Sequence, residues 1–158
     1  GSFQHNGRGK RSVALDLKQP AAREAILRLA GRADAFVSNI RPAALRRLGL
    51  DYDAVRAVNP GIVYLGMVGY GSGGRYAGRP AYDDLIQAAA GVPMLLARST
   101  GEPRFIPMAA IDRIVGSAAA NALLAGLLAR ARTGVGQHIE VPMFETMVPF
   151  VLGEHLSG

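Results

Sequence analysis

Asp112 is the residue of this sequence that is best placed to do chemistry. It stands at the head of an apolar segment, four residues before Gly116. The plainer interpretation is a capping carboxylate, which satisfies free backbone N–H groups and complements the helix dipole. A carboxylate so placed is also expected to be ionised and oriented, as attack on an acyl group requires. Type and spacing alone leave both interpretations open.

Arginines near Asn39 could bind an anion. Asn39, Arg41, Arg46 and Arg47 form a polar cluster where a short apolar run gives way to a helix pattern. Guanidinium groups can fork onto phosphate oxygens at such a junction. A solvated helix face explains the same residues equally well.

Two further segments have a chemical and a structural interpretation. The glycine run Gly69–Gly74 lacks the spacing of the dinucleotide fingerprint and of the phosphate-binding P-loop, so it indicates a flexible loop. Glycines there also let the backbone approach a ligand closely. Tyr82, Asp83 and Asp84 begin a helix, where acidic side chains complement the dipole.

Several classes of site are excluded by composition. Cysteine is absent, and no Gly-x-Ser-x-Gly motif occurs, so no cysteine or serine nucleophile constellation can be built. The three histidines, His5, His138 and His155, lack metal-ligand spacing, and we therefore expect no metal.

The charge balance favours an anionic partner. The formal net charge is +6, from 18 basic and 12 acidic residues. Apart from Lys10 and Lys18 the basic residues are arginines, and they are spread along the chain. Scattered arginines are more typical of a solvated surface than of a nucleic-acid footprint, so we expect no nucleic-acid partner.

No segment reads as a membrane anchor. The apolar stretch 114–129 falls short of the roughly 20 residues that a bilayer span needs, so we expect a buried helix there. The basic N-terminal stretch continues into the alternating residues 13–18 instead of an apolar signal-peptide core. We expect a cytoplasmic protein without a membrane partner.

The elements that must position these residues alternate between strand and helix. Apolar runs and alternating patterns predict strands at Ser12–Leu17, 35–37, 62–68 and 138–141. Helices are predicted from Pro20, from Pro42 to a stop at Gly49, over 52–58 with Asp51 as the cap, over 81–90, over 111–132 and from Met143, with a loop from 91 through 103.

This alternation predicts an α/β fold around a mainly parallel sheet. Ligands of such sheets bind beyond the carboxyl ends of the strands. Those ends are 39–41 and the glycine run, Gly69–Gly74.

Five blocks together resemble the family III CoA-transferases, the group of formyl-CoA transferase, carnitine CoA-transferase and α-methylacyl-CoA racemase. They occur in the family's order over almost the whole chain. The blocks are NGRGKRSVALDLK, the stretch from ADAFVSNIRP to MVGYG, GRPAYDDLIQAAAG, Asp112 with Gly116, and LLARARTGVGQHIEVPMFE.

The resemblance implies roles for named residues. In such enzymes the aspartate of the Asp-x-x-x-Gly block attacks the donor thioester and later carries CoA as an aspartyl thioester, a role that falls on Asp112. Tyr82 and Asp83 match positions that line the acyl pocket. CoA, as the substrate thioester, is the expected cofactor, and its site matches Leu15, Lys18, Asn39, Ile40 and Arg47.

The resemblance also implies an assembly. Family members are longer, with an earlier strand–helix unit and a large C-terminal part that carries a second glycine loop. Residues 1–158 match the central part of their large domain. Full chains of the family interlock as ring-like homodimers, so a homodimer acting on an acyl-CoA and a carboxylic acid is implied.

Two alternatives stay open. An acyl-CoA racemase or epimerase of the same family would keep the fold. In that branch a histidine directly before the aspartate acts as a base, whereas this sequence has Tyr82, whose phenol is a poor base at neutral pH. A non-catalytic, basic nucleotide-binding module is the other alternative. Against it, the sequence has no basic stripe with interleaved aromatic residues.

Overall fold

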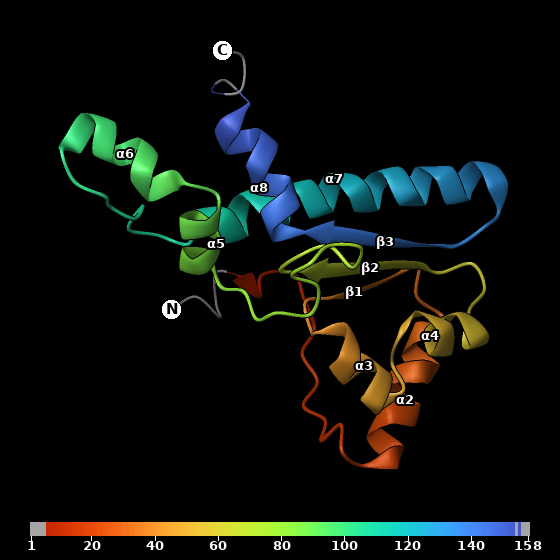
Figure 1. Ribbon diagram of the computed structural model, residues 1–158. Helices are drawn as coiled ribbons and strands as arrows, with labels where there is room; N and C mark the ends of the chain where they lie inside the picture. Colours follow the sequence, from red (N-terminus) through yellow and green to blue (C-terminus); the bar gives the residue numbers. More distant parts are fainter. Residues whose placement is uncertain (1–5, 154, 156–158) are drawn as a thin grey trace.

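The computed structural model describes residues 6–153 and 155, and its centre is a three-stranded sheet (Figure 1). The strands are β1 (Ala35–Ser38), β2 (Val63–Val68) and β3 (Gln137–Pro142), in the order β1-β2-β3. Both pairs are parallel. The predicted parallel α/β architecture is therefore confirmed, and its three later strands fall within a residue or two of their predicted positions.

Helices cover both faces of this sheet. Gly49 ends α3 in a left-handed conformation, with φ of 64°, and the Asp51 carboxylate caps α4 by accepting the N–H of Ala54, both as predicted. The helices are α2 (Pro20–Ala30), α3 (Pro42–Leu48), α4 (Tyr52–Val58), α5 (Asp83–Ala89), α6 (Val92–Thr100), α7 (Ala110–Thr133) and α8 (Met143–Leu152).

Two local predictions were wrong. Residues Ser12–Leu17 form no strand; they run as an irregular segment in which Val13 is 64% exposed. Their alternation has no neighbouring strand within the described residues to pair with, and a strand is stable only in a ladder. The predicted loop after residue 90 instead contains α6. This helix has Pro93 in its first turn, and Gly101 caps its carboxyl end.

Alternate residues of β2 point into two separate cores. Leu65 packs with Ile86 and Ile111 in the core beneath α5, α7 and α8. Tyr64 points to the opposite face, where it packs with Leu45 and other residues of the α2, α3 and α4 layer. Figure 1 shows these two layers above and below the sheet.

The long helix α7 is only partly buried. Ile111, Val115 and Ala119 face the core, whereas Leu124 and Leu128 are 65% and 55% exposed. The helix is longer than the apolar run that predicted it, and by length and composition it could cross a membrane. Core helices of water-soluble proteins share that property, and α7 packs along β2, β3, α5 and α8.

Candidate active site

The parallel sheet places several of the candidate residues at one edge. Asn39 and Ile40 follow the carboxyl end of β1, and the glycine loop Gly69–Gly74 follows the carboxyl end of β2. Because α7 leads by a short turn into the amino end of β3, its first turn lies toward the same carboxyl edge. With 24 residues, α7 is about 36 Å long, against about 20 Å for β3. Asp112, in that first turn, therefore lies beyond the strand ends, where ligands of such sheets bind.

Asp112 does not cap its own helix. It is the third residue of α7, its side chain is exposed, and its carboxylate accepts no hydrogen bond from the described residues. The pKa of Asp112 is raised above its ordinary value, first by partial burial and second by the negative charge of Asp83. The expectation that the helix end would favour the ionised form is thus corrected, because partial burial and the charge of Asp83 both favour the protonated form.

Asp83 takes the capping role that the sequence suggested for Asp112. The backbone N–H of Asp112 donates to Oδ2 of Asp83 over 2.9 Å. Asp83 is the first residue of α5, so this bond ties the amino ends of α5 and α7 together. Asp83, predicted to line an acyl pocket, and Asp112, predicted to be the nucleophile, are therefore brought into direct contact.

Gln87 belongs to the same site and was missed from the sequence. Its side chain is 1% exposed, and its Nε2 donates to Oδ1 of Asp83 over 2.7 Å. Its Oε1 accepts the N–H of Ile106 over 2.8 Å. The signal was present, because Gln87 follows Asp83 by four residues and so shares its helix face.

Two glutamates hold the glycine loop and were also missed. The N–H of Gly71 donates to Oε1 of Glu145 over 2.9 Å, and the N–H of Ser72 donates to Oε1 of Glu140 over 2.8 Å. These two amides are already paired with carboxylates, so they do not form a free cradle for phosphate. No local pattern could have shown this, because the partners are 74 and 68 residues apart.

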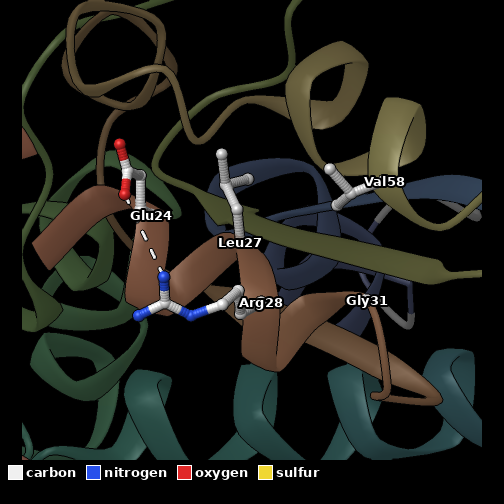
Figure 2. Close-up of a pocket in the computed structure, with 5 residues that line it drawn as sticks. All are labelled: Glu24, Leu27, Arg28, Gly31 and Val58. Atoms are coloured by element: carbon white, nitrogen blue, oxygen red, sulfur yellow. Dashed lines mark ion pairs between the residues drawn. The ribbon is translucent and has the colours of Figure 1, made fainter. Parts of the chain in front are cut away.

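Tyr82 encloses no pocket in the described part of the chain. It precedes α5, and its residue is 69% exposed. The hollow in Figure 2 lies elsewhere, against the α2 and α4 layer, and is lined by Leu27 and Val58 beside the Glu24–Arg28 ion pair of 4.0 Å. A second hollow lies near Arg130, toward the other end of α7. An acyl pocket around Asp112 therefore stays a prediction.

The residues predicted to bind CoA are exposed and come from three segments. Leu15 and Lys18 lie in the irregular segment before α2, where the backbone N–H of Lys18 donates to Asp16. Asn39 and Ile40 follow β1, and Arg47 lies in the last turn of α3. The structure shows no hydrogen bond among these five described residues, and their role stays a prediction.

The two histidines in the described part of the chain come from different segments. His138 lies on β3, His155 follows α8, and His5 is outside the described residues. In residues 6–153 and 155, no group of three or more metal-binding side chains is arranged to hold an ion.

Comparison with known proteins gives one consistent family. The model of CoA-transferase family III matches residues 1–157. The chain is 37% identical over 146 residues to the "Probable fatty acyl-CoA transferase Rv3272" of Mycobacterium tuberculosis, covering 92% of this chain and 37% of that protein. It is 30% identical to the "Succinate--glutarate CoA-transferase" of Agrobacterium fabrum, covering 98% of this chain and 39% of that protein.

Solved structures agree with these relatives. A CAIB/BAIF family protein from Brucella suis superposes with a TM-score of 0.86 at 37% identity, over 92% of this chain and 38% of that one. The orthorhombic crystal structure of Rv3272 gives 0.86 at 35% identity, over 93% and 41%. This chain thus spans roughly two fifths of the length of the relatives that it matches. By the family match over nearly every residue, the chain belongs to CoA-transferase family III.

Proposed function

We propose that the protein carrying this chain transfers CoA from an acyl-CoA thioester to a carboxylic acid through an aspartyl-CoA intermediate on Asp112. The observation that carries the proposal is the placement of the Asp112 carboxylate: exposed, beyond the strand ends, and beside Asp83. The raised pKa makes the ionised carboxylate more basic, and hence a better nucleophile.

The reaction needs only acyl exchange. An oxygen of Asp112 attacks the thioester carbonyl, the C–S bond breaks, and CoA thiolate leaves a mixed anhydride behind. The thiolate then attacks the aspartyl carbonyl and releases the donor acid as a carboxylate. The acceptor carboxylate attacks the aspartyl thioester and expels CoA thiolate again, which takes the acceptor acyl group from the second anhydride and frees Asp112.

Trapping identifies the nucleophile. The protein expressed from its complete gene is incubated with succinyl-CoA and glutarate, treated with hydroxylamine or borohydride, and digested for peptide mass spectrometry. We expect the label on Asp112 and, in Asp112→Asn, a loss of turnover on the order of 10³-fold or more. Asp53→Asn, in the first turn of α4, is the matched control and should keep full activity. A label on another carboxylate, or near-normal turnover of Asp112→Asn, would refute the assignment.

Exchange of the α-proton separates this function from the racemase alternative. Tyr82 occupies the position where the resemblance places the racemase base, and a phenol with a pKa near 10 is a poor base at neutral pH. We expect negligible deuterium uptake when succinyl-CoA is incubated in deuterium oxide without an acceptor acid. Rapid uptake that depends on Asp112 would favour racemisation.

The assembly and location belong to the same proposal. We propose a cytoplasmic homodimer, in keeping with the apolar side chains that the described residues leave exposed on α6, α7 and α8, among them Met94, Leu124, Leu128 and Phe150. Light scattering of the purified protein tests this, and a monomer at micromolar concentration would contradict it.

A further inference from the structure

Gln87 is the one buried side chain among the described residues that ends in an amide or a charged group. It is 1% exposed and lies in a core that also holds the fully buried Ile86 and Ile111. A leucine would fill such a position without needing hydrogen-bond partners. An amide thus occupies a position where an apolar side chain would pack. Its hydrogen bonds therefore set this residue apart from the apolar side chains around it.

The orientation of the Gln87 amide is fixed by its partners. The backbone N–H of Ile106 can only donate, so the atom facing it at 2.8 Å must be Oε1. Nε2 then faces Oδ1 of Asp83 at 2.7 Å, with a second contact to the carbonyl of Ile106 at 3.3 Å. The amide thus connects α5 by hydrogen bonds to Ile106, in the segment that precedes α7.

Asp83 links Gln87 to Asp112. The N–H of Asp112 can only donate, so Oδ2 of Asp83 accepts at 2.9 Å, while Oδ1 accepts from Gln87. Each oxygen of Asp83 therefore accepts one hydrogen bond, and an ionised carboxylate can accept with both of its oxygens. Its negative charge is thereby held next to Asp112, where it helps to raise the pKa of that side chain.

We propose that Gln87 is a positioning residue of this active site, which acts by orienting the Asp83 carboxylate against the first turn of α7 and so aims Asp112. The proposal rests on the proposed function, because it assigns Gln87 a role through the nucleophile. Gln87 itself does not reach the reacting atoms.

Gln87→Leu tests the role directly. The substitution keeps the core filled but removes the donor to Asp83. With succinyl-CoA and glutarate, we expect kcat to fall about 10- to 100-fold, as for other small displacements of reacting groups, with KM for succinyl-CoA within about threefold. As Asp83 turns away, the acid limb of the profile of kcat/KM against pH should move to lower pH, because the pKa of Asp112 falls.

Asn59→Leu is the matched control. Asn59 also uses a partly buried amide to tie segments together, donating to the carbonyls of Ala30 and Ala33 at 2.9 Å each, on the other side of the sheet. It should lower the melting temperature of the protein while leaving kcat and the acid limb unchanged. A Gln87→Leu variant that behaves in this way would show a merely structural role and overturn the proposal.

A paired exchange guards against loss of folding. In Gln87→Glu the side chain can no longer donate to Asp83. Adding Asp83→Asn restores the bond between residues 83 and 87 with its direction reversed, since the asparagine amide can donate to the introduced carboxylate, while its oxygen still accepts the N–H of Asp112. We expect the double variant to recover the melting temperature that Gln87→Glu alone loses, because the hydrogen bond between residues 83 and 87 is restored. Absence of this recovery, or failure of every Gln87 variant to fold, would assign Gln87 to the core alone.

The two proposals fail differently. If trapping in the wild-type protein labels a residue other than Asp112, the proposed function fails, whatever Gln87 variants do. If Asp112 is labelled and Gln87→Leu keeps the wild-type kcat and acid limb, only the role of Gln87 fails.

Discussion

At the scale of single residues, the main feature is a carboxylate held close to another carboxylate. Burial and the charge of Asp83 both disfavour ionisation of Asp112 in the folded protein, which raises its pKa, whereas in the unfolded chain neither acts. Ionisation of Asp112 therefore opposes folding. The resulting loss of stability develops as the pH rises from the ordinary aspartate value through the raised pKa, and it is complete above that pKa.

Asp112→Asn should remove this loss of stability. We expect the variant to melt at a higher temperature than the wild-type protein at pH 7, by no more than about 2–4 °C because solvent screens an exposed group. The difference should disappear at low pH, where the wild-type carboxyl is protonated in both states. Calorimetry at pH 7 and at the lowest pH where both proteins stay folded measures it.

Asp53→Asn should change the melting temperature in the opposite direction. Asp53 lies in the first turn of α4, where an acidic side chain complements the helix dipole, by about 0.3–1 kcal/mol. Its removal should lower the melting temperature slightly at pH 7. A destabilised Asp112→Asn protein would contradict the pKa direction.

At the scale of elements, the site depends on how the glycine loop is attached. Gly69 lies so close to Ala81 that any side chain at Gly69 would overlap the Ala81 methyl group. The carbonyl of Gly69 accepts the N–H of Phe144, in the first turn of α8. Together with the Glu145 contact, these close approaches connect the ends of β2 and β3 to the residues that lead into α5. The loop therefore packs against Ala81, which directly precedes Tyr82 and Asp83 in the chain.

Glu145→Ala should loosen this attachment. The loss of one exposed, charge-assisted hydrogen bond to Gly71 should lower the free energy of unfolding by about 1 kcal/mol. Hydrogen exchange of the amides of 70–74 should become faster, while amides of α2 keep their rates. Glu145→Gln retains an acceptor oxygen and should behave almost as wild type. Equal exchange rates in the alanine variant would show that Glu145 does not hold the loop.

At the scale of the whole molecule, a CoA site would have to join parts that are separate in the chain. Lys18 precedes α2 and Arg47 lies in the last turn of α3, so both belong to the layer opposite α7. Their positive charges fit the phosphates of CoA, and the net charge of +6 would attract such an anion over a longer range.

Lys18→Ala and Arg47→Ala should each weaken CoA binding by about 1–3 kcal/mol, roughly 5- to 150-fold, if each makes a charge-assisted hydrogen bond. Arg98→Ala, on α6, removes the same charge elsewhere and should leave the Kd for CoA unchanged. Calorimetric titration with CoA measures all three. Equal small effects in the three variants would mean that net charge, and not these two side chains, attracts CoA.

The sequence by itself determined the elements that depend on neighbours along the chain. Apolar runs located β1, β2 and β3, and the turn residues Gly49 and Asp51 placed helix ends correctly. These signals are local, because helix caps and strand periodicity act within a few residues. Pro93 and Gly101 are equally local signals for α6, the helix that falls within the predicted loop.

Tertiary structure decided what the polar side chains do. The sequence placed Asp112 at a helix start, but only the packing of α5 against α7 makes Asp83 cap that helix and raises the pKa of Asp112. The pairing of the glycine loop with Glu145 spans 74 residues. The alternating Ser12–Leu17 failed as a strand for the same reason. A hydrogen bond needs a partner within about 3 Å, and periodicity along the chain carries no information about which distant residue will provide it.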